Sequence, residues 1–370
     1  MDTLPLEILQ RIFTFACTDG GHAGVALSLT SKSIRAASRT ARFRSIALIA
    51  NPRRLESFLA LYERECEAAA SNGVDKPRIR HLYVTFPRVE PRRRYYSPSF
   101  SPRRRTKAQP DTEESSKDSV RKDPRPSESS RAEEDDRLPR PSRGRSTIND
   151  PSLSVTYHDA ARRFFQLVAP ELWTLVIQVG FRYGGGLHIP LFTAPFPALR
   201  EFTLIELLRP EWLFGAIDVS STGPVFPTVT HLHLLPHELE REFQLDLWTT
   251  HVPHLTHLRV SGRSSGIIDE LTLAVGAAPA PSLPPKFSGV RCLLIQPSPL
   301  PAPDGFCGTP LEEYDMALCQ LEAFVKMCRD AGLEAAIVPA CQEWFRAGVH
   351  RLREDWLNGE EHTWVDGPVS

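Results

Sequence analysis

Six segments of the chain repeat one eight-residue pattern, Pro-x-Φ-x-x-Φ-x-Φ, in which Φ is an apolar residue and x is any residue. Five copies begin with proline, and the sixth begins with Ser288 instead. Alternating apolar residues predict a short β-strand in each copy, because successive side chains of a strand point to opposite faces. From the second copy onward, the pattern returns every 26 to 35 residues, which is typical of stacked parallel strands joined by return segments. The prolines that open the five copies are Pro77, Pro170, Pro197, Pro227 and Pro253.

This repeat resembles the degenerate leucine-rich repeats of fungal proteins. The resemblance implies an α/β fold in which the apolar residues of each strand point inward and a return segment packs behind them. We place this irregular leucine-rich-repeat-like solenoid at residues 151–340, after a linker helix and a first repeat strand at 51–87. Apolar residues at helical spacing then predict a C-terminal capping helix and tail at 341–370, which would cover the outer edge of the last repeat. A generic α/β domain with similar strands is the alternative.

The first 50 residues carry apolar side chains at helical spacing. They contain LPLEIL at residues 4–9, then Ile12-Phe13, and after three glycines LSLTSKSIR at residues 27–35. These motifs resemble an F-box, in the form common in fungal proteins, and the resemblance implies a three-helix unit over residues 1–50. Short helices in so few residues bury little surface by themselves, so such a unit usually covers its apolar face with another domain or a partner chain.

The F-box resemblance also implies a partner. An F-box docks on the Skp1 adaptor of a cullin-RING ubiquitin ligase. Matched position by position, the residues at or under that contact are Leu4, Pro5, Ile8, Leu9, Ile12 and Leu29. An ordinary helical hairpin packed on its own chain is the alternative.

Residues 88–150 differ in composition from the rest of the chain. They hold 17 Lys or Arg residues and 12 Asp or Glu residues, with many Ser and Pro and almost no aliphatic side chains. Such a segment buries too little apolar surface to offset its ordering entropy, so we expect a disordered insertion. Its basic triplets and Ser-Pro pairs fit a nuclear-import or phosphorylation-controlled segment, or simply a solvated surface insertion. Without this segment, the first two copies of the pattern have an ordinary spacing.

Composition limits the class of protein. The net charge of −1 gives no reason to expect a nucleic-acid partner, and the lack of a run of 18 apolar residues argues against a membrane partner. Seven cysteines without a C-x-x-C pair fit reduced thiols in a cytoplasmic or nuclear protein. No motif indicates a cofactor.

The fifth and seventh positions of each pattern copy point away from the Φ residues, because side chains alternate along a strand. Stacked strands would present them as a row on the concave face, where solenoids usually bind, and we predict that this row holds a protein target. The histidines of the row also suggest a metal. Zinc needs three or four ligands, and no cysteine or carboxylate pair lies nearby in sequence, so we expect no metal site. The predicted target-binding residues are Glu201, Thr203, His231, His233, His257 and Arg259.

One enzyme-like motif is present. Residues 262–266 read Gly-Arg-Ser-Ser-Gly, which matches G-x-S-x-G after a predicted strand, with Asp330 and His350 following in the order of a hydrolase triad. The motif lies inside the repeat, where a turn favours Gly and Ser in any case. We therefore expect no enzyme, and predict the substrate-recognition subunit of a Skp1-cullin-RING ubiquitin ligase. The alternatives are a scaffold without a ubiquitylation role and a serine hydrolase that uses Ser264.

Overall fold

A computed structural model of the chain describes residues 4–86, 151–179, 191–207, 211–214, 223–236, 243–262, 267–277, 286–300 and 309–340, with residues 353, 354, 356 and 357. These residues belong to one unit of the chain, formed by residues 1–89 and 151–370. Three predictions lie outside the described residues: the disordered insertion at 88–150, most of the capping segment at 341–370, and Ser264. Within the described part, no helix is both long enough and apolar enough to cross a membrane.

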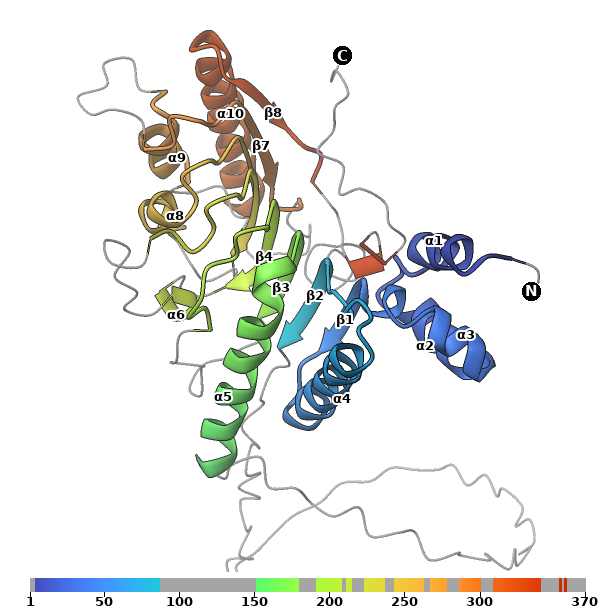
Figure 1. Ribbon diagram of the computed structural model, residues 1–370. Helices are drawn as coiled ribbons and strands as arrows, with labels where there is room; N and C mark the ends of the chain where they lie inside the picture. Colours follow the sequence, from blue (N-terminus) through green and yellow to red (C-terminus); the bar gives the residue numbers. More distant parts are fainter. Residues whose placement is uncertain are drawn as a thin grey trace, which may run out of the picture. The chain divides into compact units, whose positions relative to one another are not determined.

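Eight parallel strands of the described chain form one sheet, in which each strand pairs with its neighbours in sequence (Figure 1). The six copies of the pattern supply β2 to β7, so every strand that the pattern predicts is present. The predicted α/β class is confirmed as a mixed fold with a parallel sheet. The strands are β1 (Ser45–Ile49), β2 (His81–Phe86), β3 (Thr174–Val179), β4 (Glu201–Leu207), β5 (His231–Pro236), β6 (His257–Gly262), β7 (Cys292–Pro297) and β8 (Glu334–Ile337).

The register of the sheet aligns the same pattern position in every copy. The fifth positions form one row across the strands, from His81 through Thr174, Glu201, His231 and His257 to Cys292. A repeated pair of hydrogen bonds fixes this alignment at the start of each strand from β2 to β7. The amides of Trp173 and Thr174, for example, both donate to the carbonyl oxygen of Arg80, at 2.8 and 3.0 Å. The pattern therefore specifies the pairing of the strands as well as their existence.

The main core lies on one face of the sheet, between the Φ residues of the strands and a layer of helices. Leu82 and Val84 of β2 and Leu258 and Val260 of β6 all point into it. At its centre, the ring of Phe226 lies 4.9 to 6.0 Å, centroid to centroid, from four other phenylalanine rings. The helices that contribute to this core are α4 (Pro52–Ser71), α5 (Pro151–Val168), α6 (Glu211–Phe214), α8 (Leu245–His251), α9 (Ile267–Val275) and α10 (Thr309–Asp330). Two short 3₁₀ segments, η1 (Ala41–Phe43) and η2 (Ala169–Glu171), also contribute to it.

Local sequence explains where the first long helix begins and ends. The side chain of Asn51 accepts a hydrogen bond from the amide of Arg54 at 2.9 Å, and Pro52 occupies the first turn of α4, where no amide donor is needed. Gly73 follows the helix with a φ of 62°, a left-handed conformation that glycine adopts without strain. A helix is therefore present at the predicted place, and its buried face belongs to the main core.

Three helices precede the sheet: α1 (Leu6–Ala16), α2 (His22–Thr30) and α3 (Lys32–Ala37). They enclose a small core of their own, which Phe13, Cys17, Ala37 and Ala41 fill. Sequence analysis assigns residues 45–49 to the same N-terminal region, whereas the structure places them in β1, paired with β2. The run Ser-Ile-Ala-Leu-Ile has no opening proline and directly follows helical segments, so its short apolar stretch gives no clear period.

Candidate functional site

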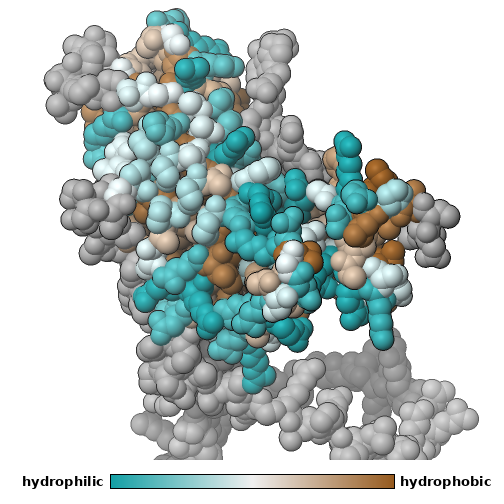
Figure 2. Space-filling view, viewed as in Figure 1, coloured by the Kyte–Doolittle hydropathy of each residue, from teal (hydrophilic) through white to brown (hydrophobic). Residues whose placement is uncertain are grey.

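Seven large apolar side chains are exposed on the N-terminal helices and the residues just before them. Phe15, Val25 and Leu29 retain 70%, 61% and 74% of their accessible surface, and the other four retain about half. Figure 2 shows brown, apolar surface at this end of the molecule. Exposed apolar patches of this kind are typical of interaction sites. We call it the N-terminal apolar surface, and its members are Leu4, Leu6, Ile8, Ile12, Phe15, Val25 and Leu29.

Helical periodicity explains why α1 exposes apolar residues. Ile8, Ile12 and Phe15 are spaced four and three residues apart, so they share the outer face of the helix. Leu9 and Phe13 lie on the opposite face and pack in the small N-terminal core. Both faces of α1 are therefore apolar, and one small core can cover only one of them.

Of the six residues that the F-box resemblance assigns to the adaptor contact, five are exposed. These are Leu4, Pro5, Ile8, Ile12 and Leu29, whereas Leu9 is half-buried in the small core. The resemblance does not assign Leu6, Phe15 and Val25, which complete the same surface. Helical spacing relative to Ile8 and Leu29 is the sequence signal that would have identified Phe15 and Val25, whereas Leu6 lies only two residues before Ile8 and has no such signal.

Two arginines fasten the N-terminal helices to the rest of the protein. Glu65 of α4 accepts from Nε of Arg39 at 2.9 Å and from Nη2 of Arg42 at 2.7 Å. Burial by itself would raise the pKa of this carboxyl, but the charges and hydrogen bonds of Arg42 and Arg39 outweigh burial and lower it. The lowered pKa shows that the ion pairs favour the charged carboxylate in the folded protein.

Close backbone contacts add to this attachment. The amide of Ala47 in β1 donates to the carbonyl oxygen of Gly20 at 2.9 Å, and the hydroxyl of Ser45 donates to the carbonyl oxygen of Thr18 at 3.1 Å. A Cβ atom on Gly24 would lie 2.7 Å from the carbonyl oxygen of Arg42. The backbone of α2 therefore lies closer to that segment than a residue with a side chain would allow. These contacts hold the helices that carry the N-terminal apolar surface against β1 and α4.

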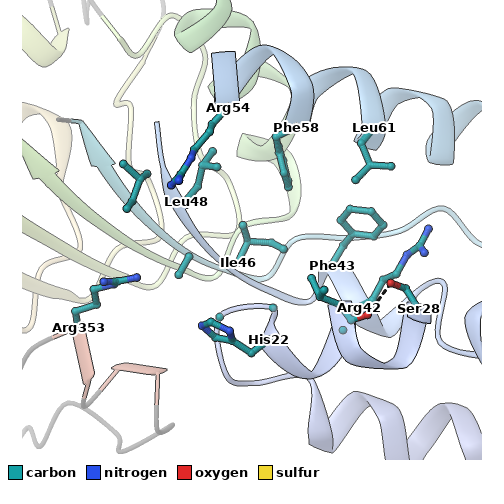
Figure 3. Close-up of a pocket in the computed structure, with 16 residues that line it drawn as sticks. His22, Ser28, Arg42, Phe43, Ile46, Leu48, Arg54, Phe58, Leu61 and Arg353 are labelled. Carbon is teal, nitrogen blue, oxygen red and sulfur yellow. Dashed lines mark hydrogen bonds between the residues drawn. The ribbon is translucent and has the colours of Figure 1, made fainter. Parts of the chain in front are cut away.

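A groove of about 460 Å³ lies between α2, β1 and α4 (Figure 3). Ile46 and Leu48 of β1 and Phe58 and Leu61 of α4 contribute apolar side chains to it. Val25 belongs both to this groove and to the N-terminal apolar surface, so the two features are continuous.

The seventh positions of the pattern are buried, apart from the half-buried Arg259, and the expectation that they are open to solvent is wrong. Thr203 and His233 retain only 9% and 3% of their accessible surface. Tyr83 and Val176, at the same position of earlier copies, pack with Trp356 in a second core on this face of the sheet. Trp356 lies in the C-terminal segment and covers a face, whereas sequence analysis expected that segment to cover the end of the last repeat.

Polar side chains of β5, β6 and β7 form a chain of hydrogen bonds on the same face. Gln296 donates through Nε2 to the carbonyl oxygen of Pro339 at 2.9 Å, so its Oε1 accepts from the hydroxyl of Ser261 at 3.0 Å and from Nη2 of Arg259 at 3.1 Å. The hydroxyl of Ser261 is also hydrogen-bonded to Nε2 of His233, at 2.8 Å. The network ties β5, β6, β7 and the segment at Pro339 together.

The fifth positions are more open than the seventh. Glu201 is exposed, and His231 and His257 are half-buried with stacked rings 4.1 Å apart. Nδ1 of each histidine is hydrogen-bonded to the hydroxyl of the threonine that precedes it, at 2.9 and 2.8 Å. In the part of the chain that the structure describes, no three His, Cys, Asp or Glu side chains are placed to hold a metal ion.

Comparison with protein-family models, curated proteins and solved structures returned no match. The predicted hydrolase residues Ser264 and His350 lie outside the described residues, and Asp330 is the last residue of α10. The features of the described chain that bear on its function are the N-terminal apolar surface and the fifth-position row.

Proposed function

We propose that the chain is an F-box substrate receptor, which binds a Skp1-like adaptor, and through it a cullin, and recruits a protein target for ubiquitin transfer. The observation that carries this proposal is the N-terminal apolar surface. Its exposed residues include most of those that the F-box resemblance assigns to the adaptor contact, for example Ile8, Ile12 and Leu29.

The energetics of this surface favour a permanent partner. Burying a large aliphatic or aromatic side chain stabilises a complex by about 1.5–3 kcal/mol relative to full exposure. Phe15 and Leu29 retain 70% and 74% of their accessible surface, so most of that gain is available to a partner. A docking surface held in place by Glu65 and the contacts of Gly20 also loses little conformational entropy on binding.

The fifth-position row is the part of the predicted target surface that is open enough to bind. Glu201 is exposed and His231 and His257 are half-buried, which gives a polar row suited to a peptide or protein. We assign target contact to these three residues. In this proposal, Thr203, His233 and Arg259 support the row from within, and catalysis belongs to the ligase that the adaptor brings.

Co-purification of the full chain with Skp1 tests the proposal. A variant with both Ile12→Asp and Leu29→Asp places two charges on the N-terminal apolar surface, and we expect Skp1 affinity to fall more than about a hundredfold. The matched control is Leu273→Asp on α9, because Leu273 is also an exposed leucine, at 57%, but lies outside the surface.

The proposal fails if wild-type protein does not bind Skp1, or if the control variant loses as much affinity as the double variant. Binding without enrichment of ubiquitylated targets under proteasome inhibition would favour the alternative of an adaptor-bound scaffold. Replacing Glu201, His231 and His257 together by alanine should remove captured targets and leave Skp1 binding unchanged.

A further inference from the structure

A second pocket, of about 290 Å³, lies beside the N-terminal helices near the start of β1 and β2. Four cationic side chains line it: Arg44, Lys76, Arg78 and Arg80. The only acidic residue of its lining is Asp75, and the hydroxyl residues Thr14 and Thr40 complete its polar wall. We call it the basic pocket. Its charge is unusual for a chain whose net charge is −1.

Two of these cations have no acidic partner among the described residues. Arg80 donates to the carbonyl oxygen of Glu171 at 3.0 Å and lies 4.5 Å from the centroid of the Trp173 ring, so it is held in place without being neutralised. Arg44 forms no side-chain hydrogen bond or ion pair with any described residue. Both side chains are half-buried.

The backbone holds these two arginines close together. The amides of Arg80 and His81 both donate to the carbonyl oxygen of Arg44, at 2.9 and 3.0 Å. Burial and the neighbouring charge of Arg80 lower the pKa of the Arg44 guanidinium. Burial, Arg44 and Arg80 likewise lower the pKa of His81 to about 4, so this imidazole is neutral at pH 7 and adds no charge of its own. A bound anion would relieve this repulsion.

Lys76 and Arg78 add two positively charged side chains beside Arg44 and Arg80. Both approach the carboxylate of Glu171, at 2.8 and 3.5 Å, yet they retain 57% and 49% of their side-chain surface. Exposed ion pairs of this kind contribute little to stability, so either side chain can turn toward a ligand at small cost. The hydroxyl of Thr40 makes no hydrogen bond with a described residue, which leaves it able to donate as well.

We propose that the basic pocket binds the phosphate group of a phosphorylated peptide side chain. Guanidinium groups bind phosphate oxygens through paired, charge-assisted hydrogen bonds, and Arg44 and Arg80 supply two such groups. A nucleotide is a poorer match, because no aromatic side chain lines the pocket to stack on a base. A phosphoinositide headgroup offers similar phosphate chemistry, and binding to vesicles distinguishes it from a phosphorylated peptide. This proposal does not depend on adaptor binding.

The test uses the purified full chain and a fluorescein-labelled peptide of alanine and glycine with one central phosphoserine. Fluorescence anisotropy should show binding of this peptide and no binding of its unphosphorylated form, and inorganic phosphate should compete. Arg44→Gln should weaken binding at least tenfold, since it removes a charge-assisted pair. Arg53→Gln is the matched control, because Arg53 is an exposed arginine of α4 outside the pocket, and its affinity should equal that of wild type.

Three results would overturn the proposal: equal affinity for the two peptides, unchanged affinity of Arg44→Gln, or binding only to vesicles that contain a phosphoinositide. Circular dichroism checks that each variant is folded. Should Arg44→Gln fail to fold, Arg44→Lys keeps the charge and removes the paired donors, and it should weaken binding of the phosphoserine peptide severalfold. An Arg44→Lys variant with wild-type affinity would equally refute the assigned role of this guanidinium.

Discussion

Replacing Glu65 by glutamine should loosen the attachment of the N-terminal helices. The wild-type carboxylate accepts from Arg39 and Arg42 at 2.9 and 2.7 Å, and the three side chains retain only 12–20% of their accessible surface. Glutamine keeps one acceptor oxygen but loses the charge, so two guanidinium groups remain close together without a counter-charge.

The size of the effect follows from this partial burial. Exposed ion pairs contribute about 0–1 kcal/mol to stability, whereas removing one partner of a buried pair costs about 3–5 kcal/mol. The Glu65 cluster lies between these limits, so we expect Glu65→Gln to lower the free energy of unfolding by about 2 kcal/mol at pH 7. For a unit of about 310 residues, that corresponds to a fall in Tm of roughly 3 °C.

The loss of stability caused by Glu65→Gln should depend on pH in a defined direction. The pKa of the Glu65 carboxyl is lower in the folded protein than in the unfolded chain. The ion pairs therefore stabilise the fold fully above the unfolded pKa of about 4.3, and this stabilisation is lost as pH falls through the folded pKa. Thermal melting by circular dichroism should show the largest difference in Tm between wild type and Glu65→Gln at pH 7, and a shrinking difference below about pH 4.

Glu63→Gln on the same helix is the control. Glu63 pairs with Arg163 at 2.7 Å, but the side chain of Arg163 is 66% exposed, so we expect a change of less than about 1 kcal/mol. Equal Tm changes for the two variants, or a Glu65→Gln effect that does not change with pH, would refute the assigned role of Glu65.

Three further predictions concern packing and thiol chemistry. Gly24→Ala should destabilise the protein by about 1–3 kcal/mol in thermal melting, because the new Cβ would lie 2.7 Å from the carbonyl oxygen of Arg42. Phe226→Ala should cost about 3–5 kcal/mol in urea unfolding, since this ring is fully buried among four other phenylalanine rings. Burial raises the pKa of Cys17 and of Cys328 to about 11, so both thiols should resist iodoacetamide at pH 7 until urea is added, as read by peptide mass spectrometry.

The strands formed by the pattern could be predicted from sequence, because the alternation of apolar residues within each copy agrees with the repetition of the pattern between copies. Each copy has alternating apolar residues, and its neighbour carries the same residues at the same positions. The sheet therefore aligns equivalent residues such as Glu201 and His231. The first strand was missed for a physical reason: Ser45–Ile49 is short, has no opening proline and follows helices directly.

The exposure of the candidate site was harder to predict than the fold. Sequence analysis treated one whole face of the sheet as open, whereas Trp356, far away in the chain, packs on Tyr83 with ring centroids 5.6 Å apart. Such a long-range contact leaves no periodic signal. The seventh positions held a partial clue, since Tyr83, Val176 and Leu294 are apolar and polar residues would be expected on an open surface. The exposed face of α1 could be predicted more reliably than the exposure of the sheet, because helical spacing depends only on residues that are neighbours in sequence.

The small N-terminal core has a consequence for how the protein is made. Every residue of that core comes from positions 9 to 41, so its contacts can close before β2 to β8 leave the ribosome. The exposed face of α1 is thus assembled early in synthesis, well before β3 to β8 are translated. Exposed apolar surface on a nascent polypeptide is prone to aggregation, and a partner that docks during translation would shield it.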